Sequence, residues 1–416
     1  MSFLNLLVVS AVAFGAPLVV RAIPVVRMPS PVLEIVAGIV LGPSVLGVVV
    51  VDAPVEVLAL IGLAFLLFLA GLEIDVHRLR GRPLRLALAG FVASFVIAVG
   101  AGFGLAAGGY TRAPLLVAIV LCATSLGLVV PVLKDAGQIA GDTGQLIVAA
   151  ASIADFGSVI LLSLFFSESS SGVGTKIGLL VGLAVVAALV VLAMMRAAPR
   201  VMSVFTMLAD TTAQIRIRFA VLLLVAFVAL AQGLGFEAIL GAFLAGAVLR
   251  LVDRDAAISH PLTQAKLDAI GYGFVVPVFF VTSGVRFDAG ALFASASTVV
   301  QVPLFLLALL LVRGVPAVLY RTRLGTRQTI AAAFLQATSL PFIVASVAIG
   351  ERLHALAPAT GAALVAAGLV SVLFFPAIAL GLLRGAPAQD PPAVVGPTGA
   401  AATEAAATGT VPEKTS

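Results

Sequence analysis

The sequence predicts an all-α polytopic membrane protein. Hydrophobic residues make up 62% of the 416 residues, charged residues only 10%, and the mean hydropathy is +1.22. A soluble domain of this length needs far more charged surface than that. Apolar runs of about 20 residues, the length at which a helix spans a hydrocarbon core, recur from one end of the chain to the other.

The apolar runs, separated by Gly, Pro and charged residues, predict about thirteen transmembrane helices. The first seven lie at about 3–22, 31–50, 54–74, 83–108, 114–133, 143–166 and 175–196. The last six lie at about 217–234, 236–252, 265–286, 298–320, 328–349 and 358–383. We expect a transmembrane domain over residues 1–384 and a disordered cytoplasmic tail over 385–416, where Pro, Ala, Thr and Gly dominate.

The basic residues predict how the chain is oriented in the membrane. Of the 24 Lys and Arg residues, most fall in one set of alternate loops, whereas the other set holds only Arg112, Lys176 and Arg352. Cytoplasmic loops carry the excess of Lys and Arg, so we expect the C-terminus in the cytoplasm and the N-terminus outside. The expected location is the cell (inner or plasma) membrane, and anionic lipid, not nucleic acid, explains the basic loops.

The sequence carries no signature of enzyme, cofactor or metal chemistry. Cys122 is the only cysteine and lies in an apolar run, and His77, His260 and His354 lie in different loops. Neither a phosphate-binding Gly loop nor a nucleophile elbow is present. We therefore expect no enzymatic activity, no cofactor and no metal site. We interpret the first apolar run as a retained span and not as a signal peptide.

Three short matches in the same order indicate an internal repeat. They are Ala-Thr-Ser-Leu at 123–126 and 337–340, GLEID at 71–75 with GVRFD at 284–288, and Glu34 and Gly38 with Glu237 and Gly241. Matching spans are an odd number of spans apart, so the second copy crosses the membrane in the opposite sense. We expect an inverted-topology repeat, with copies at about 3–167 and 217–383 and a linking span at about 175–196.

The two Ala-Thr-Ser-Leu copies lie inside predicted spans, and Pro341 directly follows the second copy. Thr, Ser and Pro inside an apolar span weaken the helical hydrogen-bond ladder and supply hydroxyls for the freed backbone groups. In inverted repeats two such breaks meet at mid-membrane and form the substrate site. Back-bonding within intact helices is the common alternative for one copy alone. The symmetric pair favours two crossed broken helices.

Asp155 lies in the middle of the sixth span, far along the chain from any other charged residue. A carboxylate at the bilayer centre costs about 2.5–3.5 kcal/mol on insertion scales, so we expect it to line a cavity and to have a function. An ionised carboxylate is a hard oxygen ligand for Na⁺ or K⁺, alongside hydroxyls and freed carbonyls. One group that holds either a proton or a cation suffices for exchange. The alternative is a structural carboxylate hydrogen-bonded in the core.

Arg313 is a second deep charge, nearer the end of the eleventh span. Its side chain either snorkels to the membrane surface, compensates the carbonyl ends of the broken helices, or pairs with Asp155. Other charges lie closer to span ends, and we expect structural roles for them at mouths, gates or interfaces. They are Glu34, Glu73, Asp75, Glu237, Arg286 and Asp288.

Several stretches in combination resemble the membrane domain of bacterial monovalent cation/proton antiporters, in the branch that contains Kef-type potassium efflux systems. They are PSPVLEIVAGIVLGPSVLG, IGLAFLLFLAGLEID, ATSLGLVVPVLKDAG, GQLIVAAASIADFGSVILL, GAFLAGAVLR and VPVFFVTSGVRFD. The resemblance covers about residues 5–383. It implies a thirteen-span homodimer in which a core domain moves against a dimerisation domain to give alternating access.

The resemblance also implies roles for single residues. Asp155 corresponds to the family's essential ion-binding aspartate, with Thr124 and Ser125 beside it as further ion- or proton-binding candidates. Arg313 corresponds to the basic residue that compensates charge. The second unwound helix of the family corresponds to Gln336, Thr338, Ser339 and Pro341.

Two departures from the family pattern bear on mechanism. Ala154 stands where Asp, Asn or Gln is usual, and Arg313 stands where electrogenic members have Lys. Arginine does not release its proton in proteins, so Asp155 is the evident proton carrier. We expect electroneutral exchange of one proton for one monovalent cation, Na⁺ or K⁺. The alternatives are a Kef-like potassium efflux channel or transporter and, more distantly, a sodium-coupled organic-anion symporter.

Overall fold

The computed structural model describes residues 3–22, 29–73, 81–139, 141–166, 172–196, 214–252 and 261–384. All regular elements within these ranges are helices, which confirms the predicted all-α class. The predicted tail over 385–416 lies outside the described residues, and so does Asp75.

The first half of the chain forms α1 to α8. Their bounds are α1 Leu4–Ala22, α2 Ser30–Leu41, α3 Ala53–Leu72, α4 Gly81–Ala107, α5 Pro114–Cys122, α6 Leu126–Asp135, α7 Asp142–Phe165 and α8 Val173–Met195.

The second half contains two helices with irregular turns. It runs through α10 Ile215–Gly233, α11 Ala238–Val252, α12 Pro261–Ile270, the π turn η2 Gly271–Val275, α13 Val276–Val285 and α14 Ala289–Phe293. It continues through α15 Ala296–Leu309, the π turn η3 Leu310–Gly314, the 3₁₀ turn η4 Val315–Tyr320, α16 Thr326–Gln336, α17 Pro341–Arg352 and α18 Pro358–Leu383.

In the described part of the chain, nine helices are long and apolar enough to cross a membrane. Shorter apolar helices occupy the other predicted spans, at Leu4–Val19, Ser30–Leu41, Pro114–Val130 and Ala238–Val252. The chain is therefore a multi-pass membrane protein. The total of about thirteen crossings and the division into two repeats stay predictions.

The predicted second span, 31–50, is wrong at its end, because α2 stops at Leu41. Gly42 adopts an extended backbone, and its N–H donates to the carbonyl of Gly38 at 2.8 Å. Pro43 follows, and the residue before a proline is pushed out of the helical region. The apolar residues that continue to position 50 form a loop that leads into α3.

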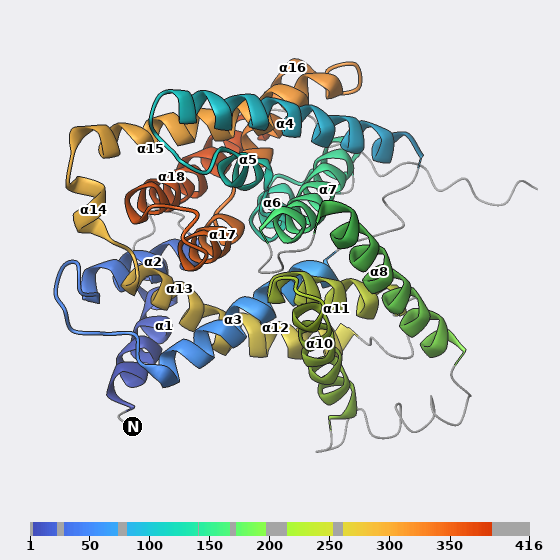
Figure 1. The fold of residues 1–416 in the computed structure, drawn as a ribbon. Helices are drawn as coiled ribbons and strands as arrows, with labels where there is room; N and C mark the ends of the chain where they lie inside the picture. The colour runs from blue at the N-terminus through green and yellow to red at the C-terminus, as the bar shows by residue number, and fades with distance from the viewer. Residues whose placement is uncertain are drawn as a thin grey trace, which may run out of the picture.

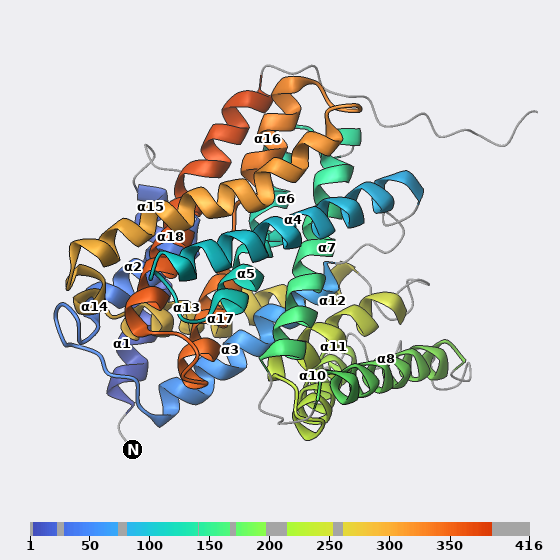
Figure 2. The ribbon, with the colours of Figure 1, turned by 45° about the horizontal axis from the view of Figure 1, so that its top comes forward.

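The helices form two groups that lie one above the other in Figure 1, and Figure 2 shows the same groups turned so that they overlap. The base group consists of α1, α2, α3, α10, α11, α12 and α13, in which α3 packs on α11 and α13, and α2 packs on α13. The crossing group consists of α4, α5, α6, α7, α15, α16, α17 and α18, in which α4 packs on α5 and α7, and α18 packs on α15 and α16. The remaining long helix, α8, packs mainly on α11.

Glycine pairs bring helices of the base group into backbone contact. A Cβ added to Gly38 of α2 would lie 2.9 Å from the Cα of Gly284 in α13. One added to Gly71 of α3 would lie 3.1 Å from the Cα of Gly246 in α11. Small residues permit such close packing between membrane helices, so any side chain at these positions would separate them.

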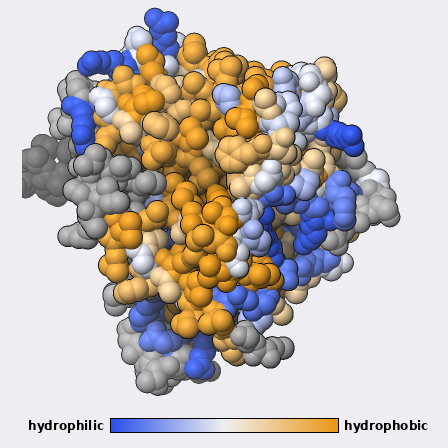
Figure 3. Space-filling model, turned by 90° about the vertical axis from the view of Figure 1, so that its left-hand side faces the viewer, coloured by the Kyte–Doolittle hydropathy of each residue, from blue (hydrophilic) through white to orange (hydrophobic). Residues whose placement is uncertain are grey.

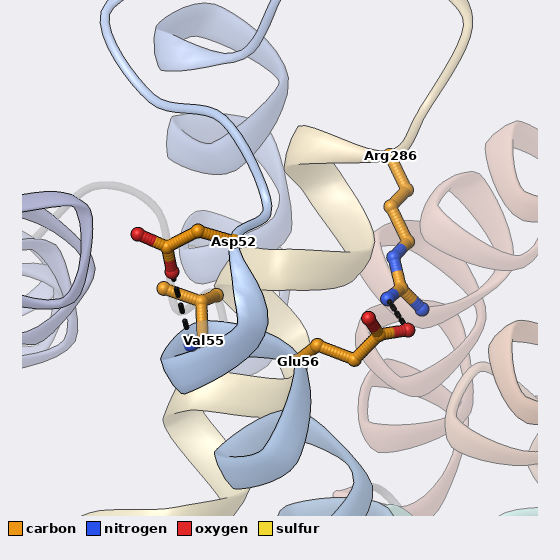
Figure 4. A network of polar contacts seen from close by, with 4 residues as sticks. All are labelled: Asp52, Val55, Glu56 and Arg286. Atoms are coloured by element: carbon orange, nitrogen blue, oxygen red, sulfur yellow. Dashed lines mark hydrogen bonds and ion pairs between the residues drawn. The ribbon is translucent and has the colours of Figure 1, made fainter. Parts of the chain in front are cut away.

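Polar contacts stabilise one end of the base group, at the beginning of α3 and the end of α13 (Figure 4). The carboxylate of Asp52 accepts a hydrogen bond from the N–H of Val55 at 3.2 Å and so caps α3. Arg286, which follows α13, forms an ion pair with Glu56 in the first turn of α3, with 3.0 Å between Nη2 and Oε1. Both partners belong to the base group.

The outer surface is largely apolar. Figure 3 shows a broad area of hydrophobic side chains on one face, with hydrophilic groups gathered toward its margins. On α8, Ile177, Val181, Val185 and Leu189 are all exposed and recur at helical spacing. Continuous apolar area of this kind is rare on soluble monomers and fits contact with lipid.

Candidate functional site

The two Ala-Thr-Ser-Leu copies interrupt two helices and lie against each other. The first copy separates α5 from α6, and the second separates α16 from α17. The N–H of Ser125 donates to the carbonyl of Thr338 at 2.9 Å, and the hydroxyl of Thr124 donates to the carbonyl of Gln336 at 2.6 Å. These hydrogen bonds confirm the predicted pair of crossed broken helices.

Local chemistry explains why the second break is stable. Leu340 leaves the helical region with φ −141°, and Pro341 begins α17, where a missing backbone N–H is tolerated. The hydroxyl of Thr338 bonds back to the carbonyl of Phe334 at 3.0 Å. Ser371 of α18 braces the break from the side, since its Oγ lies 3.4 Å from the N of Ser339.

Arg313 lies in the π turn η3 with only 1% of its surface exposed. Its Nε donates to the hydroxyl of Thr124 at 2.8 Å, and its Nη1 donates to the hydroxyl of Ser94 in α4 at 2.9 Å. The side chain therefore does not snorkel, and no ion pair joins it to Asp155 among the described residues. Because Thr124 itself bonds to Gln336, the guanidinium lies beside the carbonyl end of α16, where a positive charge is favourable.

Asp155 of α7 faces the beginning of α6. Its Oδ2 accepts a hydrogen bond from the N–H of Leu126 at 3.3 Å, and the backbone of Thr124 interacts with the same carboxylate. A helix N-terminus stabilises a negative charge, so the break in the fifth span provides a site for an anionic side chain. Ala154, the neighbouring departure from the family pattern, is fully buried and does not line the cavity described next.

A cavity of about 410 Å³ lies between the base group and the crossing group. Most of its wall is apolar, with Leu66, Phe243, Phe280 and Phe342 among the lining residues. Its polar lining residues are Asp155, Thr124, Ser125, Glu73 and Tyr272. The cavity therefore offers a small cluster of oxygen ligands in an otherwise hydrophobic space.

Glu73 and Tyr272 come from the base group and flank the first turn of α6. A Cβ added to Gly127 would lie 3.7 Å from Oη of Tyr272 and 3.8 Å from Oε1 of Glu73. Tyr272 is presented by the π turn η2, and π turns are frequent at functional sites. Glu73 interacts electrostatically with Asp155, so the cavity holds two carboxylates.

The predicted site residues divide into two sets in the structure. Asp155 and Ser125 face the cavity, and no hydrogen-bond partner is described for the hydroxyl of Ser125. The crossing itself is built by Thr124, Gln336, Thr338, Ser339, Pro341 and Arg313, of which Thr124 and Pro341 also line the cavity.

The sequence interpretation missed four residues of the site. Glu73 was expected to have only a structural role at a span end, although an acidic residue directly after an apolar run was a usable signal. Tyr272, Ser94 and Ser371 gave no signal, because single hydroxyls are common in membrane helices.

Comparison with known proteins decides the family. The family model of the transmembrane sodium/hydrogen exchanger matches residues 9–383. The chain belongs to this family. Membership of the sodium/hydrogen exchanger family confirms the predicted monovalent cation/proton antiporter family, whereas the Kef-type branch stays a prediction.

Named relatives of this exchanger family are similar over most of the chain. The putative Na⁺/H⁺ antiporter YjbQ of Bacillus subtilis is 32% identical over 390 residues, which cover 90% of this chain and 62% of YjbQ. The Na⁺/H⁺-K⁺ antiporter GerN of Bacillus cereus is 29% identical over 261 residues, covering 62% of this chain and 65% of GerN. The chain thus spans less than two thirds of the length of either relative.

A solved structure has the same fold. The sodium proton antiporter MjNhaP1 of Methanocaldococcus jannaschii matches with a TM-score of 0.59 and 18% identity, over 91% of this chain and 98% of that chain. At this level of identity the match shows a common fold.

Proposed function

We propose that this chain exchanges a monovalent cation for a proton by alternating access, with Asp155 carrying one or the other. The observation that carries the proposal is the position of Asp155, which faces both the cavity and the N-terminal end of α6. Ionised Asp155 is a hard ligand for Na⁺ or K⁺, and a proton on the same carboxylate removes that ligand. Competition for one group couples the two ions.

The residues around Asp155 have different roles in this proposal. The hydroxyl of Ser125 and the carboxylate of Glu73 are available as further oxygen ligands in the cavity. Thr124 holds the crossing through its hydroxyl, so we assign it a positioning role. Arg313 stays charged and balances the carbonyl end of α16. One-for-one electroneutral exchange then requires that Glu73 keep one protonation state throughout the cycle.

The orientation and location belong to the same proposal. The cavity extends from Asp155 toward Pro29, Pro31 and Glu73, at the beginning of α2 and the end of α3. The distribution of Lys and Arg supports a cytoplasmic position for this end. The conformation described here is then open to the cytoplasm, in a plasma-membrane protein that forms a homodimer in lipid, as the family resemblance implies.

Potassium is a second candidate cation. GerN is named as an Na⁺/H⁺-K⁺ antiporter, and the Kef-like alternative also moves potassium. The organic-anion symporter is less well supported, because the cavity wall is mostly apolar and its charged groups are carboxylates, which repel anions.

Proton flux in proteoliposomes tests the proposal. Na⁺ and K⁺ are added separately to wild type and Asp155→Asn with a pH dye inside the vesicles, and valinomycin clamps the voltage in the potassium series. We expect cation-induced proton flux that ignores voltage and vanishes in Asp155→Asn. The matched control is Asp52→Asn, which alters a helix cap far from the cavity. Flux that persists in Asp155→Asn contradicts the assignment, and a potassium leak without proton flux favours the channel.

A further inference from the structure

An ion pair joins the two helix groups at the end of the molecule opposite Glu73. Arg352, the last residue of α17 in the crossing group, donates from Nη2 to Oε2 of Glu237 at 2.6 Å. Glu237 directly precedes α11 in the base group, and only 5% of its surface is exposed. A relative movement of the two groups must break this contact, and a buried carboxylate that loses an ion-pair partner is destabilised.

A second ion pair lies at the same end of the molecule, but both of its partners belong to the base group. Glu56 and Arg286 are both in the base group, on α3 and α13 (Figure 4). Their separation does not depend on where the crossing group lies. Their side chains are also about half exposed, at 54% and 42%, so the pair contributes little to stability.

The proposed repeat gives Glu237 a counterpart. Glu34 aligns with Glu237, since each begins a Glu-x-x-x-Gly pattern in its own half of the chain. Glu34 lies in α2 of the base group, is 3% exposed, and has no ion pair among the described residues. It lies near the cavity end, because Pro29 and Pro31 of the same segment line the cavity.

The partner of Glu237 also has a counterpart. Arg352 ends α17 and Lys134 lies in the last turn of α6, the two helices that begin after the Ala-Thr-Ser-Leu copies. The residue that aligns with Arg352 is Gln138, about one helical turn beyond Lys134. The side chain of Lys134 is exposed and, in the conformation described here, interacts electrostatically with Glu73. Each half therefore supplies a buried glutamate on the base group and a basic residue at the end of a crossing helix.

We propose that two ion pairs close the two ends of the interface in turn. Glu237–Arg352 holds the two groups together at the end opposite Glu73 in the conformation described here, where a separate cavity of about 260 Å³ does not include Asp155 among its lining residues. Glu34–Lys134 forms when the crossing group has moved and the Glu73 end is shut. This inference rests on the proposed alternating access, and it adds the contacts that favour each end state. Exchange of one pair for the other keeps the two states close in free energy.

Accessibility of the cavity measures which state is populated. Because Cys122 is the only cysteine, a Cys122→Ala background with Ala70→Cys places one thiol on the cavity wall. A membrane-impermeant thiol reagent is applied from the Glu73 end in inside-out vesicles. We expect Glu237→Gln to slow labelling by about fivefold or more, a typical size for a coupling between two states.

Matched variants separate the proposal from a general loss of structure. Glu56→Gln removes a carboxylate from the same end and is expected to leave the labelling rate unchanged. The charge-reversed pair Glu237→Arg with Arg352→Glu is expected to restore it. Glu34→Gln should not slow labelling, and Glu34→Gln combined with Glu237→Gln should return the rate toward wild type. A wild-type rate in Glu237→Gln, or slow labelling in Glu34→Gln, overturns the proposal.

Cross-linking tests directly whether Glu34 and Lys134 approach each other. In the Cys122→Ala background, Glu34→Cys with Lys134→Cys should react with a short bifunctional thiol reagent, and faster when Glu237→Gln is also present. Failure of this pair to cross-link, while Glu237→Cys with Arg352→Cys does so, refutes the counterpart. Neither readout depends on transport, so both remain decisive even if Asp155→Asn fails to abolish proton flux.

Discussion

The guanidinium of Arg313 donates to the hydroxyl of Thr124 at 2.8 Å, so this buried positive charge is hydrogen-bonded to the helix crossing and interacts with Asp155 only electrostatically. Thr124 links Arg313 to the second broken helix, because its hydroxyl donates to the carbonyl of Gln336. The carboxylate of Asp155 instead faces the N-terminal end of α6. Charge compensation and ion binding are thereby assigned to different residues.

Arg313→Gln should destabilise the protein strongly. It removes a buried charge from Thr124 and Ser94 and leaves the carbonyl end of α16 uncompensated, and each of the two lost hydrogen bonds from a charged donor costs about 1.5–3 kcal/mol. Ser94→Ala removes one acceptor and should cost about 1–3 kcal/mol. Thermal unfolding of the two variants in detergent checks this order. Equal Tm values for Arg313→Gln and wild type would argue against a structural role for the charge.

Thr124→Val and Ser125→Ala should have opposite effects on Tm and on the KM for the cation. Thr124→Val keeps the shape of the side chain but removes the hydroxyl that bridges Arg313 and Gln336, so Tm falls while the KM for cation changes little. Ser125→Ala removes a cavity hydroxyl, so KM rises while Tm changes little. Flux kinetics and Tm measured on both variants test the division. The assignment is wrong if Thr124→Val mainly raises KM.

Glu73→Gln should weaken cation binding without abolishing exchange. The carboxylate shares the cavity with Asp155 but lies on the base group, so it assists the cation and does not carry the coupled proton. We expect KM for Na⁺ or K⁺ to rise several-fold, with residual proton flux. Complete loss of flux in Glu73→Gln, matching Asp155→Asn, would make Glu73 an obligatory carrier and would require a different stoichiometry.

Acid should raise the KM for the cation. A proton and a cation compete for Asp155, so in the acidic range each unit by which the pH falls raises the apparent KM for the cation by up to about tenfold. Saturating cation on the side where it binds restores the maximal rate. Initial rates over a grid of pH and cation concentration measure this. A KM independent of pH would exclude competition at one carboxylate.

Gly38→Ala should disrupt the base group. The added Cβ would lie 2.9 Å from the Cα of Gly284, and neither backbone can yield without separating α2 from α13. Gly15→Ala in α1 is the matched control, since a Cβ there meets nothing within 4 Å. We expect a lower Tm and lower yield only for Gly38→Ala, and comparable losses in both variants would count against backbone contact at this position.

The sequence predicted what depends on local chemistry. The spans follow from apolar runs, and the crossing follows from hydroxyls and Pro341 inside two of them. The end of α2 was missed because apolar residues continue past Gly42-Pro43 although the backbone does not. Ser94 was beyond local patterns, because only packing of α4 against the broken helices brings it to the site, whereas Glu73 was visible as an acidic residue at a span end but its place in the cavity depends on packing.

Proton release on cation binding is the most direct test of the central claim that Asp155 holds either a proton or a cation. Na⁺ or K⁺ is added to purified protein in weakly buffered detergent solution with a pH dye, and bound cation is measured in the same sample. At a pH low enough that Asp155 is protonated before the cation is added, we expect about one proton released per cation bound in wild type and none in Asp155→Asn. Cation binding without proton release, or undiminished release from Asp155→Asn, would contradict it.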